Sequence, residues 1–111
     1  MPPIDPALPQ AVVVADGDRL RVDLVGDLDL AVRPLLEDIL GKITAAPPVA
    51  IVVDLTAVTF LSSDALNFLA RVRQHAATGG FEVTLAGARR AALRALEVSG
   101  FTQAFPIVEA P

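Results

Sequence analysis

A continuous apolar run, Val-Ala-Ile-Val-Val at residues 49–53, lies near the middle of this 111-residue chain. A strand with one face in water alternates apolar and polar residues, whereas a strand that is covered on both faces reads as an unbroken apolar run. The run therefore predicts a central strand that is buried on both faces. Such strands occur where helices pack against a sheet, so this feature favours an α/β fold.

Strand and helix patterns alternate on both sides of this run. Asp16-Gly17 is a two-residue hairpin signal and predicts that two antiparallel strands come first. The other elements are expected to be helices at 33–43, 63–76 and 88–98 and strands at 81–85 and 105–108. This order predicts one α/β domain with a mixed sheet of about five strands and helices packed mainly on one face.

The expected domain covers residues 11–108. Residues 1–10 are rich in proline, which cannot donate to a strand ladder, so they are expected to form a flexible arm. Residues 109–111 are expected to be a tail.

Two segments read as breaks in regular structure. Residues 26–29, Gly-Asp-Leu-Asp, are expected to end the second strand, with Asp29 as a cap of the first helix. Residues 56–61 are expected to be a short connection between the central strand and the second helix. Phe60, Phe68 and Phe81 are expected in the core.

The composition excludes several classes of function. The chain has no cysteine, so it has neither a disulfide nor a cysteine-based zinc site. Its net charge of −4 argues against nucleic acid as a partner. A signal-peptide pattern is absent and no apolar run approaches the ~18 residues of a membrane span, which predicts a cytoplasmic protein without membrane insertion. We expect no metal and no cofactor.

A pair of serines, Ser62 and Ser63, stands where the second helix is expected to begin. Serine is a common N-cap residue, and Asp64 would complement the helix dipole, so the pair has a purely structural interpretation. The unpaired N–H groups of a first helical turn also attract phosphate, so a phosphorylated serine would be well placed here. The pair is therefore a candidate phosphorylation site.

Three segments in this order resemble the STAS domain: GDLD at 26–29, DLTAVTFLSSDAL at 54–66, and Gly100-Phe101. The resemblance covers 11–108 and is most similar to the small bacterial anti-sigma factor antagonists. In that family the motif reads Asp-Leu-Ser, a spacer, then Asp-Ser-Ser/Thr-Gly-Leu. Its first serine is phosphorylated by a partner that is both anti-sigma factor and ATP-dependent serine kinase.

The resemblance implies a role for each residue of the motif. Ser63 takes the phosphorylated position, with Ser62 as the second candidate, and Asp64 replaces the family's second Ser/Thr. The partner-binding residues that the resemblance implies are Gly26, Asp27, Asp29, Ser62, Ser63, Asp64 and Asn67. Binding of the anti-sigma factor would release a sigma factor, and phosphate would break the complex. A homodimer stays open.

Two alternatives remain from the sequence. The altered Ser-Ser-Asp-Ala motif also suits a STAS subunit of a lipid-transport or stress-signalling complex that is not phosphorylated. A small enzyme with Ser63 as its nucleophile would need a base, and the one histidine, His75, lies three helical turns away, roughly 18 Å at 1.5 Å per residue. No catalytic residue is therefore expected.

Overall fold

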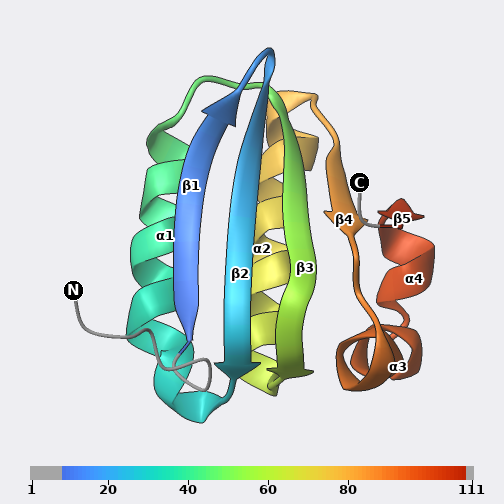
Figure 1. Ribbon diagram of the computed structural model, residues 1–111. Helices are drawn as coiled ribbons and strands as arrows, with labels where there is room; N and C mark the ends of the chain where they lie inside the picture. Colours follow the sequence, from blue (N-terminus) through green and yellow to red (C-terminus); the bar gives the residue numbers. More distant parts are fainter. Residues whose placement is uncertain (1–8, 110–111) are drawn as a thin grey trace.

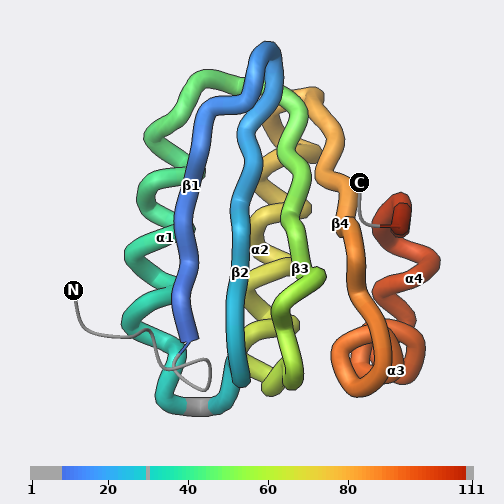
Figure 2. Tube along the Cα trace, viewed as in Figure 1, coloured from blue at the N-terminus to red at the C-terminus, as the bar shows by residue number. Residues whose placement is uncertain are grey.

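The computed structural model describes residues 9–109, which form a five-stranded mixed sheet with helices (Figures 1 and 2). The strands are β1 (Gln10–Asp16), β2 (Arg19–Leu28), β3 (Ala50–Leu61), β4 (Val83–Ala86) and β5 (Ile107–Val108). The helices are a 3₁₀ turn η1 (Leu30–Val32), α1 (Arg33–Ala45), α2 (Ser63–Gly79), α3 (Arg90–Val98) and α4 (Phe101–Ala104). The strands lie in the order β1-β2-β3-β4-β5, with β1 antiparallel to β2 and the others parallel. The predicted α/β class and mixed sheet are confirmed.

The core lies between the sheet and the two long helices. Figure 1 shows α2 behind β2 and β3 and α1 behind and to the left of β1, and none of the helices formed by residues 9–109 lies in front of these strands. Along β2 the buried residues Leu20, Val22 and Leu24 alternate with Arg19, Arg21 and Asp23. From the other layer, apolar residues of α1 and α2 recur at helical spacing and pack on the same core: Leu36, Ile39, Leu40, Ile43, Ala65, Phe68, Leu69, Val72 and Ala76.

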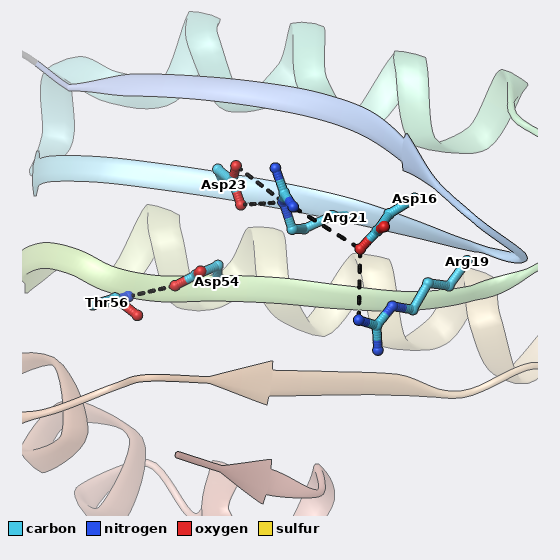
Figure 3. Close-up of polar contacts among 6 residues, drawn as sticks. All are labelled: Asp16, Arg19, Arg21, Asp23, Asp54 and Thr56. Atoms are coloured by element: carbon cyan, nitrogen blue, oxygen red, sulfur yellow. Dashed lines mark hydrogen bonds and ion pairs between the residues drawn. The ribbon is translucent and has the colours of Figure 1, made fainter. Parts of the chain in front are cut away.

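The open face of the sheet carries ion pairs, which Figure 3 shows in close-up. Arg21 Nε lies 3.1 Å from Asp23 Oδ1, and Arg19 Nη2 lies 3.5 Å from Asp16 Oδ2. On β3, Asp54 Oδ1 accepts a hydrogen bond of 2.9 Å from the Thr56 N–H. Charged side chains thus lie on this face beside apolar ones such as Val12, which is opposite Asp23, and Val52, which is opposite Arg21.

The apolar run at 49–53 is a central strand, as predicted, but it is not buried on both faces. Ile51 and Val53 are buried, whereas Ala50 is exposed and Val52 is only partly buried. Ile51 and Val53 face the α1–α2 layer, and Val52 pairs with Arg21 and Thr84 on the opposite face. The run is apolar on the open face as well, without a second helical layer to explain it.

The two segments that were expected to be breaks are strand except for Asp29, so these expectations were wrong for residues 26–28 and 56–61. Residues 26–28 belong to β2, and residues 56–61 belong to β3. The two extensions pair with each other, with Asp27 opposite Phe60 and Leu28 opposite Leu61. Gly26 permits this because its φ of 93° lies in the left-handed region, which costs glycine little. Pairing between strands that are far apart in sequence thus outweighs the local turn signals.

The ends of the helices mostly follow the sequence signals. Gly80 ends α2 with a left-handed φ of 77°, as its position predicts. Asp29 caps η1 rather than the first α-helix itself, because the 3₁₀ turn comes between them. The short helix α4 was not expected. The arm expected at 1–10 lies outside the described residues as far as residue 8, and Gln10 is already part of β1.

Among the described residues, no helix has both the length and the apolar character needed to cross a membrane.

Candidate functional site

Ser62 is the residue that caps α2. Its backbone is extended, and its Oγ accepts a hydrogen bond of 3.2 Å from the Ala65 N–H in the first turn. The Ser62 N–H in turn donates to the carbonyl of Leu28, at 2.8 Å, at the end of β2. Only 6% of Ser62 is exposed. Its hydroxyl is therefore buried and engaged as the cap of α2, while its backbone N–H ties the start of the helix to the end of β2.

Ser63 differs from its neighbour in position and in exposure. It is the first residue of α2, and its side chain is exposed. It stands at the positive end of the helix dipole, with Asp64 beside it in the same turn. The structural interpretation of the pair therefore fits Ser62, which caps α2, and a phosphorylation site would be Ser63, which is accessible.

The end of β2 brings the Gly-Asp-Leu-Asp segment next to this helix start. Gly26 is buried, whereas Asp27 and Asp29 are exposed. Asp27 accepts a hydrogen bond from the hydroxyl of Thr59 on β3, and Asp29 Oδ1 accepts one of 3.0 Å from the Ala31 N–H. Because β2 and β3 are parallel, their carboxyl ends lie at the same end of the sheet. Open α/β sheets bind their ligands beyond the carboxyl ends of their strands.

A narrow cleft between α1 and α2 contains the last two predicted site residues, Asp64 and Asn67. Arg33, at the start of α1, lines the same cleft. Deeper along the helices, Arg71 Nη1 and Glu37 Oε1 form an ion pair of 2.8 Å that joins α2 to α1. The seven residues named from the sequence therefore lie along the carboxyl ends of β2 and β3, the turn after β2 and the first turns of α2.

Sequence reasoning missed one prominent neighbour of this region, Phe60. The expectation that Phe60 is in the core was wrong, because 47% of it is exposed. Val58 and Leu61 face the core, so the two residues between them, Thr59 and Phe60, are both left outside. No local sequence signal predicts this exposure. Side chains of a strand alternate between the two faces of the sheet, and here the alternation is interrupted at an irregularity in the pairing of β3 with β2. Phe68 is buried as expected, and Phe81 is partly buried against the core.

The residues of an imagined serine–histidine pair are not brought together. The ring of His75 packs edge-on against the ring of Phe81, with centroids 5.5 Å apart. Phe81 follows the C-terminal end of α2, whereas Ser63 begins that helix. In the described part of the chain, no group of three or more His, Cys, Asp or Glu side chains could hold a metal ion.

Comparisons with known proteins agree with this architecture. A STAS-domain containing protein of Pseudomonas aeruginosa (strain UCBPP-PA14) is 32% identical over 97 residues, which cover 87% of this chain and 95% of that protein. The anti-sigma-F factor antagonist RsfB of Mycobacterium tuberculosis (strain H37Rv) is 42% identical over 60 residues, 53% of this chain and 49% of RsfB. The crystal structure of an anti-sigma factor antagonist from Mycobacterium paratuberculosis superposes with a TM-score of 0.78 at 30% identity, covering 94% of this chain and 88% of that one.

The match of a family model extends over almost the whole described chain. The model is described as "Mlab, STAS domain" and matches residues 11–109. This range begins in β1 and ends just after β5, so it includes every strand of the sheet and both serines. The chain belongs to the STAS domain family, and its relatives include anti-sigma factor antagonists.

Proposed function

We propose that this protein is an anti-sigma factor antagonist that binds an anti-sigma factor and thereby releases a sigma factor. The observation that carries the proposal is the exposed Ser63 on the first turn of α2, next to a buried Ser62 that already serves as the cap. The proposed binding surface is presented by Asp27, Asp29, Ser63, Asp64 and Asn67 and supported from beneath by the buried Gly26 and Ser62, and we call these seven residues the switch corner. The proposed role is binding without catalysis, and it places the protein in the cytoplasm with its partner.

The proposed regulation is phosphorylation of Ser63 by the partner, which would act as an ATP-dependent serine kinase. A phosphate adds about −1.5 to −2 charges at neutral pH. At the start of α2 that charge meets free N–H groups and the positive end of the helix dipole, so the fold itself tolerates it. Asp27, Asp29 and Asp64 make the switch corner acidic. The phosphate would therefore act on the complex, through repulsion and desolvation at the interface, rather than by unfolding the protein.

A second candidate function is that of a STAS subunit in a lipid-transport or stress-signalling complex that is not phosphorylated. The observation that favours it is Asp64, which places a carboxylate directly after Ser63, where the family motif has Ser or Thr. A fixed charge at this position would repel a phosphate on the neighbouring residue. In this case the switch corner would still be the docking surface, and Ser63 would stay unmodified.

Affinity capture from the native cells tests the proposal, with mass spectrometry both of the partners and of the peptide that contains the two serines. We expect an anti-sigma factor with kinase activity, and phosphate on Ser63 in part of the pool. Ser63→Ala should retain the partner when ATP is added, whereas Ser63→Glu should bind it at least about tenfold more weakly. Gln103→Glu is the control, because it adds the same charge to an exposed residue of α4, outside the switch corner.

The outcomes separate the two candidates. Recovery of a transport ATPase, with both serines unmodified, would favour the second. Equal affinities of Ser63→Ala and Ser63→Glu for the captured anti-sigma factor would refute the role of Ser63. Covalent labelling of Ser63 by a fluorophosphonate would instead indicate a nucleophilic serine enzyme and overturn both.

A further inference from the structure

The strand β1 is a long edge of the sheet. It is the first in the strand order, and within residues 9–109 it pairs with β2 alone, from Gln10 opposite Val25 to Asp16 opposite Arg19. Alternate residues of an edge strand direct their N–H and C=O groups away from the sheet, where another strand can pair with them. The opposite edge, β5, has only two residues. β1, with seven residues, is therefore the edge at which a further strand could be added.

Within Gln10–Asp16, β1 has few of the features that usually protect an edge. This stretch has no lysine, no proline and no bulge, which are among the devices that natural edges use. Residues 11–15 read Ala-Val-Val-Val-Ala, and the pairing with β2 runs through them without a shift in register. Val12 is 51% exposed, although it is a large apolar residue in a strand. An apolar edge of this length is suited to pairing.

The sequence of β1 is close to a palindrome around Val13, and this identifies the kind of strand that fits it. We propose that two copies of this protein pair through β1, antiparallel and about a two-fold axis at Val13, so that the two sheets become continuous. In this register Ala11 meets Ala15 of the second copy, Val12 meets Val14, and Val13 meets its own equivalent. Similar side chains thus face each other along the whole apolar stretch, on both faces of the joined sheet.

The charges at the ends of β1 also suit a second copy. The same register places Gln10 opposite Asp16, so no like charges meet. The carboxylate of Asp16 already has two cations nearby, Arg19 Nη2 at 3.5 Å and Arg21 Nη1 at 3.9 Å, as Figure 3 shows. A strand from an unrelated partner would have no reason to match this symmetry. The palindrome and the compensated ends therefore favour self-association, which does not depend on the proposed function.

Two double variants of the full chain test the register as well as the edge. On β1, Val12 lies opposite Asp23 of β2, and Val14 lies opposite Arg21. In Val12→Lys/Val14→Glu each new charge has an opposite partner on β2, and across the two-fold axis the new lysine faces the new glutamate of the other copy. In Val12→Lys/Val14→Lys two lysines face each other on either side of the axis.

Sedimentation equilibrium between roughly 5 and 500 µM should give a reversible dimer for the wild type and for the lysine–glutamate variant. The lysine–lysine variant should dissociate at a concentration at least about tenfold higher. Circular dichroism and thermal melting of each variant establish that it is folded. A wild type that stays monomeric over this range would overturn the proposal, and so would equal dissociation constants for the two variants.

Amide hydrogen exchange of the wild type tests the same interface without any substitution. Alternate amides in Gln10–Asp16 point away from β2. Their protection should increase with protein concentration, whereas the amides that pair with β2 should be protected at every concentration. Protection of both sets that is independent of concentration would contradict the proposal. Protection that arises only with a different protein would assign the edge to a partner's strand instead.

Discussion

Replacement of Ser62 by alanine should show how much the helix cap contributes to the free energy of unfolding, without changing the proposed phosphorylation site Ser63. The substitution removes the Oγ that accepts from the Ala65 N–H at 3.2 Å. Because Ala65 is only 1% exposed, water cannot readily replace this acceptor, and the N–H is left without a partner. Loss of an N-cap costs about 0.5–2 kcal/mol, and a buried unpaired donor places Ser62 in the upper half of that range. We therefore expect about 1–2 kcal/mol less free energy of unfolding.

Urea denaturation followed by circular dichroism would measure this loss as a lower midpoint with an unchanged slope. For a domain of this size, the melting temperature should fall by about 4–8 °C for each kcal/mol that is lost. Ser63→Ala is the matched control, and because Ser63 is exposed, its effect should stay within about 0.5 kcal/mol. Ser62→Asp should recover most of the loss, since aspartate is also a good N-cap. The reasoning is wrong if Ser62→Ala is as stable as the wild type, or if Ser63→Ala is the more destabilised of the two.

Two further substitutions test conclusions about exposure and backbone conformation. Phe60→Ala should change stability little, because 47% of Phe60 is exposed, while Phe68→Ala should cost about 3–5 kcal/mol, because Phe68 is 3% exposed. Equal losses of the free energy of unfolding in urea would contradict the placement of Phe60 outside the core, and the same Phe60 variant should weaken binding to the anti-sigma factor if Phe60 contributes to the interface. Gly80→Ala should cost about 1 kcal/mol of stability through its φ of 77°, although a Cβ there would meet nothing within 4 Å. Thermal melting would measure it, and an unchanged melting temperature would show that α2 can end in another conformation.

Elements with a strong local signal could be predicted from the sequence. The hairpin at Asp16-Gly17, the stop of α2 at Gly80 and the start of α2 at the serine pair all lie where expected. In each case a few adjacent residues determine the conformation, through a glycine at positive φ or a side chain that caps its own helix. The set of site residues was implied by the family resemblance, and the structure places it near the carboxyl ends of β2 and β3, which lie at the same end of the sheet because these strands are parallel.

The tertiary structure decided the features that depend on contacts between distant residues. β2 and β3 continue through segments that look like turns, because Asp27 and Leu28 find backbone partners in Phe60 and Leu61, more than thirty residues away. The position of the cap relative to the sheet is likewise tertiary, because the Ser62 N–H donates to the carbonyl of Leu28 at the end of the distant strand β2. The exposure of Phe60 follows from the same pairing. Local propensity amounts to less than about 1 kcal/mol per residue, so the pairing of strands and the burial that accompanies it determine the outcome wherever the two disagree.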